Sequence, residues 1–162
     1  SGEGPALTLL RQREIEARIV GPLLQAVRDE LGEEKTLQIA RAVIAKLARD
    51  SGAELARAFG EATLSAFARS LDRWSEGEAL EIEMLEQSPQ RLAFNVVRCR
   101  YAEMYRALGL AELGATLSCT RDFALVEGFN PEIRLTRTQT IMQGASHCDF
   151  RFASPDASGP SA

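Results

Sequence analysis

The sequence is poor in several kinds of feature, and each shortage removes a class of protein. No apolar run in the 162 residues approaches the ~20 residues that a membrane-spanning helix needs, so we expect no membrane partner. No run of basic residues occurs, and a net charge of -4 with a pI near 5.2 argues against nucleic acid as a partner. The opening SGEGPAL lacks the hydrophobic region of a signal peptide, and we therefore expect a cytoplasmic protein.

Cysteine and histidine are scarce as well, with three cysteines and one histidine in the chain. An odd number of cysteines cannot form a complete set of disulfides within one chain, so free thiols in a reducing compartment are the simpler interpretation. No C-x-x-C pair is present, and Cys99, Cys119 and Cys148 are separated by about 20 and 29 residues, unlike typical zinc ligands. We predict neither a metal nor another cofactor.

The first half of the chain carries a helical pattern. Apolar residues recur at helical spacing up to about residue 76, which predicts three or four amphipathic helices over 8–76. Breaks are expected at Gly32, Gly52, Gly60 and Gly77, and Pro22 can begin or kink a helix. These helices can pack within the chain or pair with a second copy, so the sequence leaves open whether the protein is a homo-oligomer.

The second half changes to alternating patterns. Residues 80–86 and 91–98 read as two strands joined by a turn. Residues 101–108 and 113–127 read as helices, the second broken by Gly128, and 133–142 and 147–152 read as strands. This β-β-α-α-β-β order over 78–152 predicts an α+β fold, with the N-terminal helices packed on an antiparallel four-stranded sheet. We expect one domain over 1–152 and a flexible tail over 153–162.

The predicted last strand contains the only histidine of the chain, next to other reactive groups. Side chains alternate along a strand, so His147, Asp149 and Arg151 share one face. That face is either a solvated edge or the wall of a polar pocket. Cys148 lies on the other face between phenylalanine positions, where a buried small hydrophobe is the default interpretation.

Two further positions combine a reactive group with a charge. Cys119 and Asp122 are three residues apart on a predicted helix and share a face, so Cys119 is either a core residue or a thiol whose ionisation a cation promotes. Every cation after residue 46 is an arginine. Arg137 falls on a mostly apolar strand face, where its partner is either an internal acid or an anionic ligand.

An ordered set of motifs resembles one known family. The motifs are CRY at 99–101, LSCTRD at 117–122, GFNP at 128–131, LTRTQT at 135–140, and Gly144 followed by CDFR at 148–151. Together they resemble the L-2-amino-thiazoline-4-carboxylic acid hydrolases over about residues 80–152, and the helical N-terminal part also fits. The resemblance implies an intracellular hydrolase that opens a small ring, in the type reaction 2-amino-thiazoline-4-carboxylate to N-carbamoyl-L-cysteine.

The implied reaction suggests roles for the candidate residues. One route uses a cysteine thiolate as nucleophile, with Cys119 as first choice and Cys148 as second, and His147 as acid and base. Another route has His147 or a carboxylate activate water directly. Asp122 or Asp149 would hold the amidinium group. The remaining candidates for substrate binding are Arg98 or Arg137 for the carboxylate, Tyr101 as a hydrogen-bond donor, Cys99 in the pocket floor, and Arg151 beside Asp149.

Three rival hypotheses remain open from the sequence. The first alternative is a non-catalytic domain that binds a small molecule. Thiols of normal pKa at Cys119 and Cys148 would favour it. The second alternative is a metal-binding protein that uses the three cysteines and His147. A third alternative is a hydrolase of another ring, such as a lactam or a cyclic imide.

Overall fold

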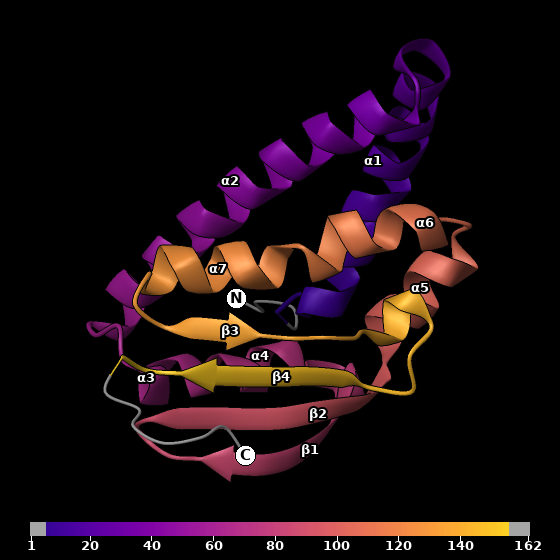
Figure 1. The fold of residues 1–162 in the computed structure, drawn as a ribbon. Helices are drawn as coiled ribbons and strands as arrows, with labels where there is room; N and C mark the ends of the chain where they lie inside the picture. The colour runs from indigo at the N-terminus through magenta and orange to yellow at the C-terminus, as the bar shows by residue number, and fades with distance from the viewer. Residues whose placement is uncertain (1–5, 156–162) are drawn as a thin grey trace, which may run out of the picture.

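Two long helices begin the fold and diverge from a shared turn. The computed structural model describes residues 6–155 (Figure 1). Helix α1 covers Leu9–Leu31 and helix α2 covers Glu33–Phe59, with the turn between them at Gly32, whose φ is +84°. Pro22 lies inside α1 without dividing it. Two short helices follow, α3 (Leu64–Ala68) and α4 (Ser70–Trp74), so the expected helical half is confirmed.

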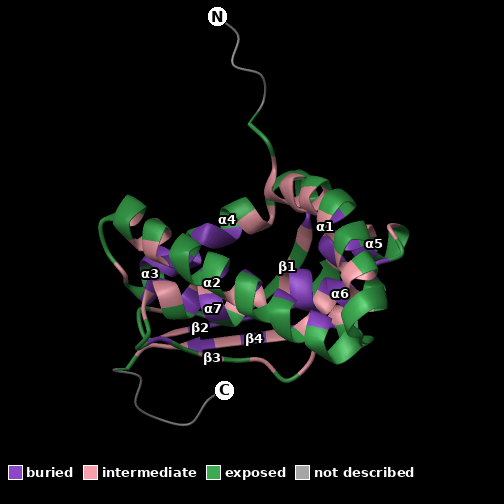
Figure 2. Cartoon of the chain, turned by 90° about the horizontal axis from the view of Figure 1, so that it is seen from above, coloured by how far each residue is buried: buried purple, intermediate pink, exposed green. Residues whose placement is uncertain are grey.

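The second half forms a four-stranded antiparallel sheet in the order β1-β2-β4-β3. The strands are β1 (Leu80–Gln87), β2 (Arg91–Cys99), β3 (Arg134–Thr136) and β4 (Cys148–Ala153). Between β2 and β3 lie α5 (Arg100–Ala107), α6 (Ala111–Gly114), a π-helical turn (Ala115–Cys119) and α7 (Arg121–Phe129). Helices α2, α3, α4 and α7 lie on one side of the sheet (Figure 2). The predicted α+β fold is therefore confirmed.

Aromatic side chains fill the space between the sheet and these helices. In the register of β2 and β4, Phe94 pairs with Phe150 and Leu92 with Phe152, and all four are buried. The Phe94 and Phe150 rings stack with their centroids 4.9 Å apart. Phe67 of α3 contacts Phe152 from the helical layer, at 5.1 Å between centroids. Aromatic pairs of this kind add to the burial of apolar area that holds the two layers together.

Gly52 and Gly128 allow α2 and α7 to cross with their backbones in contact. A Cβ added to Gly128 would lie 2.0 Å from the carbonyl oxygen of Arg49, and one added to Gly52 would lie 2.0 Å from that of Leu125. The predicted helix breaks at these two glycines are wrong, because both residues lie inside helices. Glycine permits this close approach because it has no Cβ.

The predicted strand over 133–142 is also corrected, because β3 ends at Thr136. The carboxylate of Asp149 accepts hydrogen bonds from the backbone N–H groups of Thr138 and Gln139, both at 2.9 Å. These two N–H groups are therefore not available for backbone hydrogen bonds between β3 and β4. A 3-10 turn follows at Ile141–Gln143. The remaining extended segment, 137–140, carries Arg137 toward α7.

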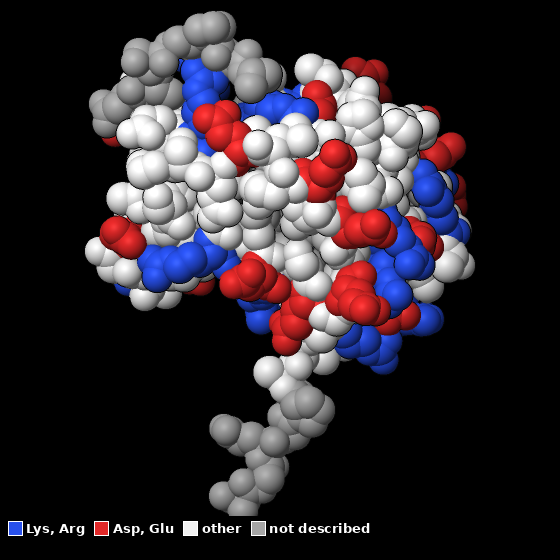
Figure 3. Space-filling model, turned by 90° about the horizontal axis from the view of Figure 1, so that it is seen from below, with Lys and Arg blue, Asp and Glu red and all other residues white. Residues whose placement is uncertain are grey.

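The predicted tail over 153–162 begins within the sheet. Ala153 belongs to β4, Ser154 donates its backbone N–H to Gln90, and residues 156–162 lie outside the described part of the chain. No helix within residues 6–155 is long and apolar enough to cross a membrane. On the face seen in Figure 3, acidic and basic side chains are interspersed, and that face carries no continuous basic patch.

Candidate active site

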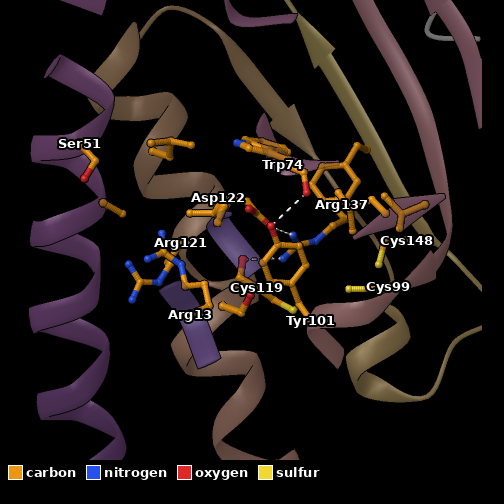
Figure 4. A pocket seen from close by; sticks show the side chains of 17 residues that line it. Arg13, Ser51, Trp74, Cys99, Tyr101, Cys119, Arg121, Asp122, Arg137 and Cys148 are labelled. Carbon is orange, nitrogen blue, oxygen red and sulfur yellow. Dashed lines mark hydrogen bonds and ion pairs between the residues drawn. The ribbon is translucent and has the colours of Figure 1, made fainter. Parts of the chain in front are cut away.

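A pocket of about 120 Å³, here called the inner pocket, lies between the sheet and the surrounding helices (Figure 4). It brings together the three cysteines, Asp122 and Arg137, which the sequence left at unknown separations. Its lining residues are Leu9, Arg13, Ala48, Ser51, Trp74, Leu80, Val96, Cys99, Tyr101, Ser118, Cys119, Arg121, Asp122, Leu125, Arg137, Cys148 and Phe150.

The π-helical turn before α7 presents two of these groups. Thr120 donates from both its backbone N–H (2.9 Å) and its hydroxyl (3.0 Å) to the carbonyl of Ala115, five residues earlier. This wider turn shifts the direction in which the following side chains project from the helix axis. Such turns are frequent at functional sites. Cys119 at its end and Asp122 in the first turn of α7 both line the inner pocket.

The three thiols are held in their neutral form. Burial raises the pKa of Cys99 to about 11, and burial together with the nearby Asp122 carboxylate raises the pKa of Cys119 to about 12. Burial also raises the pKa of Cys148. The sulfur of Cys99 accepts from the N–H of Ala102 at 3.4 Å, and that of Cys148 from the N–H of Ile141 at 3.2 Å. None of these surroundings favours a thiolate over its thiol at neutral pH.

Asp122 and Arg137 form an ion pair on one wall of the pocket. The Nη1 atom of Arg137 lies 2.5 Å from Oδ2 of Asp122, and Nη2 donates to the carbonyl of Cys119 at 3.1 Å. The guanidinium also lies over the rings of Phe123 (5.0 Å) and Phe150 (5.2 Å). Arg137 therefore has the internal acid that was one of its two expected kinds of partner.

The same environment makes Asp122 the titratable group best suited to proton transfer. Burial raises the pKa of the Asp122 carboxyl to about 6, although the adjacent Arg137 favours the charged form. A carboxyl group with a pKa near 6 is mostly ionised at neutral pH yet takes up a proton more readily than a solvated one. Among the described residues, no donor reaches its second oxygen, Oδ1.

Six of the ten residues predicted from the sequence line the inner pocket, and their roles stay predictions. They are Cys119, Asp122, Cys148, Cys99, Tyr101 and Arg137. The Tyr101 hydroxyl donates to the carbonyl of Trp74 at 3.0 Å, so its proton is already engaged, and burial raises the pKa of this phenol.

The other four predicted residues do not line the pocket. The His147 ring bonds to the Ser146 hydroxyl (2.9 Å), and the Asp149 carboxylate accepts from the segment after β3. Arg98 is exposed and pairs with Glu103 at 3.1 Å. Arg151 donates to the Phe94 carbonyl and the Asn95 amide oxygen, both at 2.9 Å.

Four further polar or aromatic residues complete the site, three of them from the helical half, and none was predicted from the sequence as a site residue. Arg13, Ser51 and Trp74 come from α1, α2 and α4, and Arg121 precedes Asp122 in α7. The π-helical turn before Arg121 is visible only in the structure, because hydrophobic periodicity does not reveal it. Nothing in the local sequence around Arg13 distinguishes it from an arginine on a solvated helix face.

A larger cleft of about 1080 Å³, here called the outer cleft, lies between α1, α2, α4 and α7. The inner pocket and the outer cleft share six lining residues: Leu9, Arg13, Ser51, Trp74, Arg121 and Leu125. The outer cleft therefore adjoins the inner pocket along these residues. Arg13 and Arg121 lie at the junction, with their guanidinium groups side by side in Figure 4.

The rival metal site is not assembled by this fold. Within residues 6–155, no group of three or more His, Cys, Asp or Glu side chains is arranged to hold a metal ion. His147 lies outside the inner pocket that the cysteines share. The four side chains of that hypothesis therefore do not form one ligand set.

Comparisons with known proteins give a family and a fold. Residues 12–152 match the model of a family described as L-2-amino-thiazoline-4-carboxylic acid hydrolase. No curated protein matches the chain. Among solved structures, the chain is similar to a trafficking protein particle complex subunit 3 from Naegleria fowleri, covalently bound to palmitic acid. The TM-score is 0.51 at 10% identity over 88% of this chain and 94% of that one, a likeness of fold alone.

Proposed function

The chain belongs to the L-2-amino-thiazoline-4-carboxylic acid hydrolase family, and on that premise we propose that it opens a small ring with an amidine-like carbon and a carboxylate. The observation that carries the proposal is Asp122: a carboxyl group with a pKa of about 6 inside a small pocket that the family match covers. A volume of about 120 Å³ suits a single ring better than a drug-sized ligand.

Substrate binding uses the free oxygen of Asp122. Arg137 bonds to Oδ2 and fixes the carboxylate in place, while Oδ1 accepts from the amino group of the amidine-like ring. The apolar walls, including Phe150 and Leu125, exclude water from around the ring. This arrangement places the ring carbon between nitrogen and sulfur close to a base.

The chemical step is then a hydrolysis with Asp122 as general base. Asp122 takes a proton from water as the water oxygen bonds to the ring carbon, giving a tetrahedral intermediate. Starting from the protonated, amidinium form of the ring, the carbon–sulfur bond then breaks and the ring sulfur takes the proton from Asp122. The remaining hydroxyl proton leaves to solvent as the carbonyl forms, so the product carries a carbamoyl group on nitrogen and a free thiol. One water is consumed, and no electrons are transferred to or from the protein.

The raised thiol pKa values support this route over a covalent one. Attack by Cys119 requires its thiolate, and a pKa of about 12 leaves little thiolate at neutral pH. Cys119 and Cys148 then shape the pocket. The assignment of His147 as acid and base stays a prediction, and it requires a movement that brings the ring into the inner pocket.

The test follows loss of L-2-amino-thiazoline-4-carboxylate and appearance of its thiol product, for the wild-type protein, Cys119→Ser, and wild type with a chelator. We expect turnover in all three. Loss of turnover in a folded Cys119→Ser variant, with a covalent adduct in the wild type, would support the thiol route. Loss with chelator would require a metal-activated water. No turnover by the wild type would overturn the proposed substrate, and lactams and cyclic imides would then be tested in its place.

A second candidate function is binding of an acyl chain. Three thiols line a pocket that opens into a cleft of about 1080 Å³, and the similar solved structure is of a protein covalently bound to palmitic acid. In thioester exchange the thiolate of a pocket cysteine, a minor form at neutral pH, attacks an acyl thioester, keeps the acyl group and releases the donor thiol. Intact mass before and after hydroxylamine treatment tests this candidate, because hydroxylamine cleaves thioesters.

A further inference from the structure

Two guanidinium groups at the junction of the inner pocket and the outer cleft share a single carboxylate. Arg13 of α1 donates from Nη1 to both oxygens of Glu16, at 3.1 and 3.0 Å. Arg121 of α7 reaches the same carboxylate through Nη2 at 3.5 Å, and its Nε donates to the Leu117 carbonyl at 2.6 Å. The cluster therefore joins α1 to α7 across the entrance.

This cluster carries more positive than negative charge in a poorly solvated position. The side chains of Arg13 and Arg121 are 19% and 17% exposed, whereas that of Glu16 is 38% exposed. Burial lowers the pKa of Arg121, and the like charge of the nearby Arg13 lowers it further. Arg137 and Asp122, deeper in the pocket, neutralise each other. Within the cluster of Arg13, Arg121 and Glu16 the formal charge is +1, and an anionic ligand bound to the two guanidinium groups would offset it.

Glu16 occupies the place that such a ligand would take. It lines the outer cleft but not the inner pocket, whereas both arginines line both spaces. A ligand entering from the cleft therefore meets the two guanidinium groups before it reaches Asp122. Because a guanidinium binds a carboxylate through paired N–H groups, a substrate carboxylate can replace Glu16 in the same geometry.

The position of this cluster also limits the size of the ligand. Arg121 and Asp122 are consecutive residues of α7, one at the entrance and the other on the inner wall. A ligand whose carboxylate reaches Arg121 and whose cation reaches Asp122 must therefore be short.

We propose that Arg13 and Arg121 form the carboxylate-binding site for a small zwitterionic substrate, and that Glu16 is a built-in competitor which the substrate carboxylate displaces. Two parts of this proposal rest on the proposed function: the direction of binding, and the pairing of the substrate's positively charged amidine-like group with Asp122. The carboxylate site itself rests on the contacts of the two arginines. We place the carboxylate here and not at the two arginines that the sequence suggested, because Arg98 does not line the pocket and the charge of Arg137 is neutralised by Asp122.

Calorimetric titration tests the proposal without requiring turnover. The probes are L-thiazolidine-4-carboxylate, which lacks the amidine-like carbon, and its neutral carboxamide. We expect the carboxylate to bind the wild type more tightly than the carboxamide. We expect Arg121→Gln and Arg13→Gln each to weaken carboxylate binding by about tenfold to a hundredfold, as for loss of a charged hydrogen bond, with little effect on the carboxamide.

Glu16→Gln should change carboxylate affinity in the opposite direction from the arginine variants. A merely structural role of Glu16 would not produce this gain. Removing the competing carboxylate should tighten carboxylate binding severalfold. Arg121→Lys retains the charge and serves if Arg121→Gln fails to fold. Arg18→Gln is the matched control, since Arg18 lies in the same helix as Arg13, is 58% exposed and pairs with Glu14 at 3.1 Å.

Equal binding of the two probes, absence of binding by both, or unchanged binding in the arginine variants would overturn the carboxylate site. Failure of the proposed function looks different. In that case the wild type does not turn over cyclic amidines, but the preference for the carboxylate and its loss in the arginine variants persist.

Discussion

Asp122 and Arg137 join two parts of the chain that are distant in sequence, with 2.5 Å between Oδ2 and Nη1. The aspartate belongs to the first turn of α7, and the arginine to the extended segment after β3. Only 8% of the arginine side chain and 23% of the aspartate side chain are exposed. The pair therefore lies where water screens it weakly, and the Arg137 guanidinium opposes the rise that burial imposes on the pKa of the Asp122 carboxyl.

The pH dependence of turnover should report the ionisation of Asp122. Its pKa of about 6 means that the base form is present above that pH and lost below it. We expect kcat/KM to rise with pH through about 6 and then to level off. A pH–rate profile from pH 4.5 to 8 provides the measurement, and an acidic limb far from pH 6 would argue that another group is the base.

Stability should depend on pH through the same group. The folded-state pKa of Asp122 lies above its ordinary value of 3.8, so the folded protein binds more protons than the unfolded chain between about pH 4 and pH 6. The contribution of Asp122 to stability is therefore fully present at low pH and declines as pH rises through this window. Denaturant unfolding of the wild type and Asp122→Asn at pH 4.5 and pH 7 measures the difference. A wild type that gains stability relative to Asp122→Asn over this range would contradict the assigned shift.

Removing Arg137 should leave Asp122 ionised without its partner. We expect Arg137→Gln to move the acidic limb of the pH–rate profile upward and to cost about 3 kcal/mol or more in the free energy of unfolding. Arg134→Gln is a suitable control, because Arg134 is exposed at the start of β3. An unchanged limb in Arg137→Gln would show that the ion pair does not control the catalytic base.

The crossing of α2 and α7 gives a prediction about packing. Gly128→Ala places a Cβ against the Arg49 backbone, which cannot move independently of α2, so we expect a loss of about 3 kcal/mol. Gly21→Ala is the matched comparison. There the new Cβ meets only the Leu110 side chain, which can change rotamer, so a loss of about 1 kcal/mol or less is expected. Similar losses in the two variants, measured by denaturant unfolding, would contradict the close backbone approach.

The fold was more accessible from the sequence than the site. Alternation of side chains along residues 91–98 and 147–152 predicted β2 and β4, because burial of one sheet face imposes a period of two. Gly52 and Gly128 were misread because a glycine needed for close approach looks the same in one sequence as a glycine that ends a helix. The early end of β3 depends on the Asp149 side chain, a competition for backbone donors that strand patterns do not contain.

The site residues were likewise predictable only in part. Cys119 and Asp122 were found because their spacing is local, and Arg137 because a charge stood out on an apolar strand face. His147 was chosen for its chemistry, yet its ring bonds to Ser146, outside the pocket. Arg13 lies more than a hundred residues before Arg121 in the sequence, and only the packing of α1 beside α7 brings them together on Glu16.

The most direct test of the account is the rate at which wild type and Asp122→Asn convert L-2-amino-thiazoline-4-carboxylate to its thiol product at pH 7.5. Asp29→Asn, at an exposed position of α1, is the control. The account predicts turnover by the wild type and the control, and a loss of about 10²- to 10⁴-fold in kcat for folded Asp122→Asn. Turnover by Asp122→Asn at the wild-type rate would contradict the assignment of Asp122 as the general base.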